Sequence, residues 1–308
     1  MRSRDFLLYD VFTERPCAGN QLAIVLKSDG LDTEAMQEIA REFNLSETVF
    51  VGAQQDGMRT PIRIFTPVDE MPFAGHPTVG TAVALSELGM SAANDNNDTD
   101  ASIIILDEPI GSVRCLVSKD ARGSFAEFDL PQLPSAAKFK MSHEDAAAVL
   151  GLMPQDIGFE NHKVTAWDAG VPYVCIPVHN LDAAASANLD PRLWAELIGG
   201  NGDAASPAAY VYCRDTIGHD HAFHARMFSG HWGIVEDPAT GSAAAAFAGA
   251  VMMFDEPTDG TTAFWIEQGL EMGRPSSIRL ELDVEGGKLT GARIGGYAVK
   301  IGEGVIYR

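Results

Sequence analysis

The sequence predicts an α+β protein built from two similar halves. Two observations support this: many short strand-like segments surround very few long helices, and one strand-to-helix segment occurs twice in the 308 residues. The composition is that of a globular protein able to bury a core, because 46% of the residues are hydrophobic and 21% are charged. A chain of this length suits one large domain or two of ordinary size.

The net charge limits the kinds of partner that the protein can bind, and the cysteine pattern indicates the cellular compartment. The net charge of −21 disfavours nucleic acid and anionic membranes, although helix N-termini can still bind a small anion. The four cysteines form no CxxC pair and no zinc spacing, as is usual for reduced thiols. The apolar run before Asp10 is too short for a signal peptide or a membrane helix. We therefore expect a cytoplasmic protein with no nucleic acid or membrane partner.

The first half is predicted to be mostly strands, with two helices. In chain order the pattern gives strands at 6–13 and 20–27, a helix at 31–44, strands at 46–52 and 60–67, a helix at 76–89, and strands at 102–106, 111–117 and 124–130. Met36, Ile39, Ala40 and Phe43 give the first helix one apolar face. The second helix is apolar nearly all round, as a buried helix would be, and Gly89 suits its end.

A proline-marked stretch without periodicity, 130–142, is the predicted boundary between the halves. The second half then repeats the same kinds of element: helices at 142–151, 189–200 and 237–254, and strands at 171–178, 208–215, 221–229 and within 276–308. The N-terminal half is expected to span 1–130, possibly completed by 296–308, and the C-terminal half 131–295. The polar stretch 91–102 is expected to be a solvated loop.

The repeated segment starts at Arg63 and again at Arg226. The two copies read RIFTPVDEMPFAGHPTVGTAVAL and RMFSGHWGIVEDPATGSAAAAFAGAV. Each has arginine, an apolar residue, phenylalanine and a hydroxyl residue, then acidic residues, a glycine and an apolar helix. The arginine precedes that glycine by 12 residues in the first copy and by 15 in the second, so one short insertion relates them. A duplicated domain explains this better than chance likeness between two strand–turn–helix segments.

A duplicated fold predicts where the binding site lies, because two buried helices would present their N-termini toward one cleft between the halves. Free N–H groups and the helix dipole make such a place suitable for a carboxylate. Asp237, His76 and Ser242 would lie at the rim of that site.

Five stretches carry a resemblance to a known family: VFTERPCAGNQLAIVL, NLSETVFV, RIFTPVDEMPFAGHPT, GIVEDPATGSAAAA and GGYAVKIGEG. In order and over nearly the full length, they resemble the phenazine-biosynthesis isomerase (PhzF-like) family. That resemblance implies the diaminopimelate epimerase-like fold, in which each pseudo-symmetric half is a curved, mostly antiparallel, barrel-like sheet around a central buried helix. It also implies a cofactor-free isomerase, commonly a homodimer, that closes its halves over a small carboxylate-bearing substrate.

The resemblance also assigns site residues. It places the catalytic glutamate at Glu47, the cleft histidine at His76, the cleft aspartate at Asp237 and the ATGS serine at Ser242. Gln21, where the family often has proline, and Ala74, where it often has cysteine or glycine, depart from the pattern and leave the substrate open. We assign Gly75, Gly241 and Ser242 to substrate binding through backbone N–H groups, and extend that role to three further residues, Asn20, Thr78 and Thr240.

Glu47 can also be judged from its own surroundings. If LSETVFV is extended, Leu45, Glu47, Val49 and Val51 point to one apolar side. Burial there would raise the pKa of the carboxyl, which suits a general acid or base. The alternative is an exposed glutamate at a strand start, or one paired with an arginine, and the resemblance favours the catalytic interpretation.

Other candidates have plain alternatives as well. His76 could be a structural histidine that donates to a carbonyl, but a helix N-terminus favours the neutral ring, which can handle protons. Asp237, followed by proline before a helix, could be only a cap or turn. The histidines of GHDHAFHARMFSGHW could suggest a metal site. However, His219 and His221 would share a strand face while His224 faced away, and no ligand spacing is complete, so no metal and no cofactor are expected.

The leading hypothesis is an isomerase that shifts a proton within a small carboxylic acid, with Glu47 as general acid/base and His76 and Asp237 assisting. One alternative is a two-base racemase or epimerase of an amino or hydroxy acid. Related enzymes use a facing cysteine pair at the helix starts, whereas this chain has His76 and Ser242 there. The other alternative is a non-catalytic protein that binds small acids.

Overall fold

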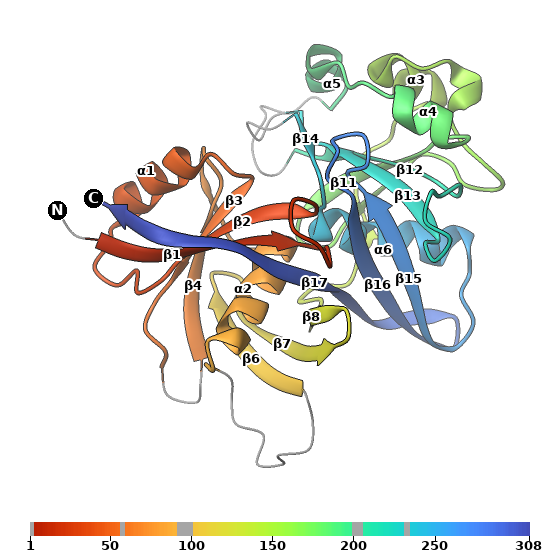
Figure 1. Cartoon of the computed structure of the whole chain (residues 1–308). Coiled ribbons are helices and arrows are strands. Elements are labelled where there is room, and N and C mark those ends of the chain that lie inside the picture. Colours follow the sequence, from red (N-terminus) through yellow and green to blue (C-terminus); the bar gives the residue numbers. More distant parts are fainter. Residues whose placement is uncertain (1–2, 56–58, 91–100, 199–205, 231–234) are drawn as a thin grey trace. The chain divides into compact units, whose positions relative to one another are not determined.

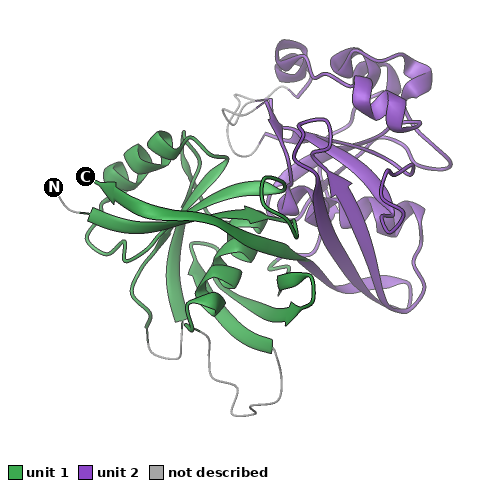
Figure 2. Ribbon diagram, in the orientation of Figure 1, with its two compact units in different colours: residues 1–131, 295–308 green, residues 132–294 purple. Residues whose placement is uncertain are grey.

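The computed structural model describes residues 3–55, 59–90, 101–198, 206–230 and 235–308 (Figure 1). It divides into two compact units (Figure 2): unit 1 comprises 1–131 and 295–308, and unit 2 comprises 132–294. Most of the polar stretch 91–102, and His231 of the histidine cluster, lie outside the described residues. The predicted fold class is confirmed, because each unit is a mixed, mostly antiparallel sheet with a central buried helix.

Unit 1 is a closed barrel of eight strands. Its strands are β1 (Ser3–Val11), β2 (Asn20–Val25), β3 (Glu47–Val51), β4 (Arg59–Phe65), β6 (Ala101–Glu108), β7 (Gly111–Asp120), β8 (Gly123–Asp129) and β17 (Lys288–Tyr307), with the short β5 (Glu70–Met71) beside β4. In that order each strand pairs with the next around the barrel, and β17 closes it by pairing with β1. The pairs β2–β3 and β4–β6 are parallel, because a helix connects the two strands in each case.

Two helices belong to unit 1. The central helix α2 (Gly75–Glu87) contacts β1, β2, β3, β6, β7 and β8 and is buried from Gly75 to Leu85, as its all-round apolar sequence predicts (Figure 1). The amphipathic α1 (Thr33–Phe43) packs its predicted face, Met36, Ile39 and Ala40, against Phe50 and Phe65. Strand β3 therefore has apolar neighbours on both faces.

Unit 2 repeats this order of pairing. Its strands are β9 (Ser135–Ala136), β10 (Thr165–Asp168), β11 (Pro172–Pro177), β12 (Ala208–Cys213), β13 (Phe223–Phe228), β14 (Glu236–Asp237), β15 (Gly260–Gln268), β16 (Ser276–Glu285) and the first part of β17. Its helices are α3 (His143–Leu150), η1 (Pro154–Asp156), α4 (Leu181–Ser186), α5 (Pro191–Ile198) and the central, buried α6 (Gly241–Phe254). The parallel pairs are β11–β12 and β13–β15, which match β2–β3 and β4–β6. Within the described residues no helix is long and apolar enough to cross a membrane.

The repeated arginine makes the same contacts in both units. The guanidinium of Arg63 binds both carboxylate oxygens of Glu70, and that of Arg226 binds both oxygens of Glu236. Each guanidinium also lies over a phenylalanine ring, 5.1 Å from the centroid of Phe65 in unit 1 and 4.7 Å from that of Phe228 in unit 2. The duplication predicted from the sequence is thus present in the side-chain contacts.

Strand register extends this match residue by residue. Phe65 pairs with Glu70 and Phe228 with Glu236, so the insertion lies between these partners. From there the copies align without a gap. The matched pairs are Met71 with Asp237, Pro72 with Pro238, Ala74 with Thr240, Gly75 with Gly241, and His76 with Ser242.

Neighbouring strands supply three more matches. Thr48 pairs with Phe65 and Ala209 with Phe228, which makes Ala208 the counterpart of Glu47. Leu22 pairs with Glu47 and Tyr173 with Ala208, so Val171 is the counterpart of Asn20. Pro61 pairs with Asp107 and His224 with Glu267, which makes Gln268 the counterpart of Glu108.

One local prediction was wrong. The strand expected at 221–229 starts at Phe223, so His219 and His221 precede it in a turn and do not share a strand face. Gly218 and Thr216 explain this turn, because the Thr216 hydroxyl donates to the carbonyl of Gly218 and the N–H of His221 donates to that same carbonyl. Local side-chain bonds of this kind compete with strand pairing.

The packing of α6 gives a test of the fold. A Cβ at Gly249 would lie 2.2 Å from the ring of Trp167 on β10. Glycine to alanine normally stabilises a helix, but here overpacking should outweigh that gain, so Gly249→Ala should destabilise the protein by about 1–3 kcal/mol. Urea unfolding measures this. Met253→Ala on the same helix, where the methionine is exposed, should change stability by less than about 0.5 kcal/mol. A stabilised Gly249→Ala protein would contradict this packing.

Candidate active site

Four of the predicted site residues come together in unit 1. Asn20 is the first residue of β2, Glu47 the first of β3 and Gly75 the first of α2, with His76 next. Because β2 and β3 are parallel, both strands begin at the same end of the barrel, beside the helix start. Nδ1 of His76 lies 3.3 Å from Oε2 of Glu47 and 3.4 Å from Nδ2 of Asn20.

Burial controls the charge of His76. The residue is 3% exposed, and this burial lowers the pKa of the imidazole to about 3, although a hydrogen bond to the backbone of Gln21 acts in the opposite direction. The ring is therefore neutral near pH 7. The sequence predicted a neutral ring because of the helix dipole, whereas loss of hydration is the main physical cause.

Nδ1 of a neutral His76 can either accept or donate a hydrogen bond, depending on the tautomer. That atom faces a donor, the amide of Asn20, and an acceptor, the carboxylate of Glu47. In one tautomer Nδ1 accepts from Asn20, and in the other its hydrogen points to Glu47. The side chain of Glu47 is 15% exposed, so the carboxyl is mostly shielded while part of it stays open to solvent. This arrangement suits a group that handles protons.

The start of α2 supplies backbone donors beside this pair. Its N-cap, Ala74, makes no side-chain hydrogen bond, so the first N–H groups of the helix, those of Gly75 and His76, gain nothing from a cap. Such groups and the helix dipole favour a carboxylate. Thr78, predicted to bind substrate, lies at the end of the first turn, where its hydroxyl contacts Ala74 and Glu108 within the protein.

The other predicted residues come together in unit 2, at the start of α6. Thr240 is the N-cap of the helix, and its hydroxyl donates to Oδ2 of the buried Asp237 at 2.6 Å. Asp237 is therefore not the N-cap of α6, which was the alternative role considered from the sequence. Ser242, the second helical residue, has its hydroxyl 2.8 Å from that of Tyr173 on β11. Gly241 is the first residue of the helix, where its N–H has no partner within the helix.

The two helix starts have the same framework and different chemistry. Where unit 1 has Glu47, His76 and Asn20, unit 2 has Ala208, Ser242 and Val171. Where unit 2 has Asp237, unit 1 has Met71. The pair of Glu47 and His76 thus belongs to one copy of the duplicated fold and the buried Asp237 to the other.

Three polar residues that contact the helix starts were not predicted from the sequence. Tyr173 contacts Ser242, Gln268 binds the N-cap of α6, and Glu108 binds the first turn of α2. Glu108 and Gln268 end matched strands, β6 and β15, so aligning the repeat beyond the helices could have found them. No comparable pattern singles out Tyr173.

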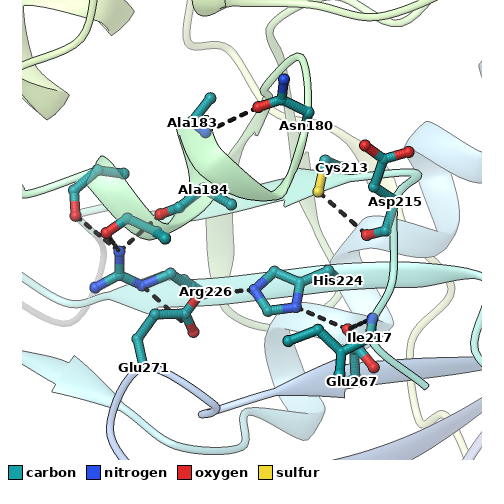
Figure 3. Close-up of polar contacts among 12 residues, drawn as sticks. Asn180, Ala183, Ala184, Cys213, Asp215, Ile217, His224, Arg226, Glu267 and Glu271 are labelled. Carbon is teal, nitrogen blue, oxygen red and sulfur yellow. Dashed lines mark hydrogen bonds and ion pairs between the residues drawn. The ribbon is translucent and has the colours of Figure 1, made fainter.

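Two described members of the histidine cluster, His221 and His224, contact acidic residues. His224 is buried between Glu267, 2.9 Å from Nδ1, and Glu271, 2.9 Å from Nε2, with Arg226 nearby (Figure 3). Burial lowers the pKa of His224, but the hydrogen bonds to both carboxylates outweigh it and raise the pKa to about 9. In the part of the chain that the structure describes, no group of three or more His, Cys, Asp or Glu is arranged to hold a metal ion.

A chain with this duplicated barrel and an acid–histidine pair at one helix start has the features of an enzyme that transfers protons. The family model for phenazine biosynthesis-like proteins (PhzC-PhzF) matches residues 9–304. The chain belongs to that family.

Individual relatives and a solved structure support this family membership. An uncharacterized isomerase of Mesorhizobium japonicum is 56% identical over 308 residues, which cover 100% of both chains. The trans-2,3-dihydro-3-hydroxyanthranilate isomerase of Pseudomonas aeruginosa is 32% identical, with 98% of this chain and 99% of the relative covered. The crystal structure of a PhzF-family phenazine biosynthesis protein of Bacillus anthracis matches with a TM-score of 0.87 at 27% identity, over 100% of both chains. These matches place the chain among the isomerases of this family.

The pKa values of two buried histidines, His76 and His224, should be shifted in opposite directions. Imidazole ¹⁵N NMR should show His76 neutral from pH 8 down to about 4, and His224 doubly protonated up to about pH 8. As a control, Glu271→Gln should lower the pKa of His224 and leave that of His76 unchanged, because Glu271 contacts only the former of the two. A protonated His76 at pH 6 would show that burial does not control this ring.

Proposed function

We propose that the chain is a cofactor-independent isomerase that shifts a proton within a small, carboxylate-bearing substrate. The observation that carries this proposal is the pair formed by Glu47 and the buried, neutral His76 at the start of α2, 3.3 Å apart. Its counterparts in unit 2, Ala208 and Ser242, cannot form such a pair.

In the proposed reaction the substrate carboxylate binds the first N–H groups of α2. Glu47 removes a proton from a substrate carbon and returns it at another position, acting first as base and then as acid. His76 stays neutral and stabilises the charge that develops on the substrate or on Glu47, with Asn20 fixing the ring. Shielding from water strengthens these interactions.

Unit 2 would contribute groups for binding. We assign Asp237 to a polar or amino group of the substrate and the hydroxyl of Ser242 to a second polar group. The N–H of Gly241 would bind an anionic oxygen, and Thr240 would hold the carboxylate of Asp237 in place through its 2.6 Å hydrogen bond. That the two helix starts serve one substrate stays a prediction of the sequence, as do the homodimer and the cytoplasmic location.

Two features favour an isomerase with one acid/base group over a two-base racemase or epimerase. A two-base mechanism needs a second proton-transfer group opposite the first, and the matched positions in unit 2 carry alanine and serine. The cysteines are unsuitable as well. None of the four stands at the start of α2 or α6, and burial raises the pKa of Cys115, Cys175 and Cys213.

The first compound to test is trans-2,3-dihydro-3-hydroxyanthranilate, which the name of the Pseudomonas aeruginosa relative specifies. It is a small acid with an amino group, so it suits the groups assigned above. Related unsaturated or amino-bearing acids should be tested beside it, because Gln21 and Ala74 depart from the family pattern.

Replacing Glu47 should abolish the proton shift. In heavy water the wild type should isomerise its substrate and introduce deuterium at the carbon that exchanges, and Glu47→Gln should be slower by about 10²–10⁴-fold. Rates and label content can be followed by NMR. Glu42→Gln, the same change at an exposed position of α1, is the matched control and should behave like wild type. Equal rates for Glu47→Gln and wild type would refute the role of Glu47. Tight binding without exchange by any tested acid would instead favour a non-catalytic binding protein.

Thiol alkylation should leave the isomerase active. Only Cys17 is exposed, so alkylation of the native protein should modify that residue alone, which mass spectrometry can verify. Activity should stay within about twofold of the untreated enzyme, since no thiol takes part in the proposed reaction. Loss of activity that also occurs in a Cys17→Ser variant would reopen the thiol-based racemase.

A further inference from the structure

The hydroxyl of Thr78, buried in the first turn of α2, contacts two oxygen atoms. Its Oγ1 lies 2.8 Å from the carbonyl oxygen of Ala74 and 2.8 Å from Oε1 of Glu108. A hydroxyl has one hydrogen to donate, and a carbonyl oxygen can only accept. If Thr78 donates to Ala74, the contact with Glu108 needs a second hydrogen. Only a protonated Glu108 can supply it.

Among the described residues, no cation acts on the pKa of Glu108. The residue is 6% exposed, and its Oε2 is buried without a hydrogen-bond partner among the described residues. Arg59 pairs with Asp107, the preceding residue of β6. Burial raises the pKa of Glu108 to about 8, although its contact with the Thr78 hydroxyl acts in the opposite direction.

Among the described residues, two titratable groups near Glu108 lie on β7 and β8. On β7, Cys115 lies close enough for the charge of Glu108 to raise the pKa of that thiol, and Asp129 at the end of β8 acts on the same thiol. From α2 the nearest polar group is Thr78, and His76 on the same turn is neutral. None of these groups would stabilise a carboxylate at Glu108.

Unit 2 has a neutral amide at the matched position. Gln268 donates from Nε2 to the carbonyl of Asp237 at 2.8 Å and to Oγ1 of Thr240 at 3.1 Å. Its Oε1 accepts from the N–H of Thr240 at 3.3 Å. Gln268 thus holds the N-terminal segment of α6 with one donor group and one acceptor group. A protonated glutamate has the same pair of functions, whereas a carboxylate can only accept.

We propose that Glu108 carries a proton and acts as a positioning residue for the first turn of α2, as Gln268 does for the start of α6. The chain of contacts from Glu108 through Thr78 to Ala74 encloses the turn that contains Gly75 and His76. The effect on His76 rests on the proposed function, whereas the proton on Glu108 does not.

The proposal predicts a pH dependence of stability with a defined sign. The folded carboxyl keeps its proton up to about pH 8, whereas its ordinary pKa is 4.5. Between these values the folded state binds more protons than the unfolded state, so stability falls as the pH rises. Glu108→Gln has no proton to lose and removes this part of the pH dependence.

Infrared spectroscopy and urea unfolding test the proton without any substrate. At pH 6 the wild type should show the carbonyl band of a protonated buried carboxylic acid, which Glu108→Gln should lack. The urea midpoint of wild type should fall relative to that of Glu108→Gln between pH 5 and pH 9. The reciprocal variant, Gln268→Glu, should gain both the band and the pH-dependent loss. Identical spectra at pH 6, or midpoints that keep a constant difference, would overturn the proposal.

Activity and imidazole NMR test the positioning role. Glu108→Gln should keep the activity of wild type at pH 7 and lose less of it above pH 8, and its His76 resonances should be unchanged. Glu108→Met, of similar size but without hydrogen-bonding groups, should lower kcat by about tenfold or more and shift the His76 resonances. A Glu108→Gln enzyme as impaired as Glu108→Met would overturn the positioning role. If Glu47→Gln were fully active, the proposed function would fail, while the infrared and unfolding results would still decide the state of Glu108.

Discussion

The burial of a helix start inside a closed barrel is the constraint on which the rest of unit 1 depends. Away from water, the first turn of α2 must find its polar partners within the protein. Strands β2, β3 and β6 supply them as Asn20, Glu47 and Glu108. The same burial keeps His76 neutral, so the imidazole beside Glu47 is not a fixed cation.

Duplication explains how one site could arise within a stable framework. Both units keep the arginine that binds a glutamate and lies over a phenylalanine, and both hold their central helix by a residue at the end of a matched strand. Those positions maintain the fold. The changed positions are the ones around the helix starts, where unit 1 has Glu47 and His76 and unit 2 has Ala208 and Ser242. Copies that share a framework and differ at a few polar positions indicate where the chemistry lies.

The fold class and several residues of the candidate site could be predicted from the sequence. The repeat and the all-round apolar helices gave the fold class, and the short spacing from helix start to Asp237 gave one group of residues in unit 2. Glu108 and Gln268 could not be read from local pattern, because each contacts a residue about 30 positions earlier through strand register. The strand expected at 221–229 begins at Phe223 instead, because local hydrogen bonds hold the preceding residues in a turn.

The central claim is that one group, Glu47, both removes and returns the proton. A single-turnover experiment in ordinary water, with substrate carrying deuterium at the carbon that loses its hydrogen, tests this most directly. If Glu47 does both, part of the deuterium should appear at the new position in the product, because the same carboxyl carries it there. A product whose new hydrogen comes entirely from solvent, from the first turnover onward, would contradict direct transfer of one and the same proton by Glu47.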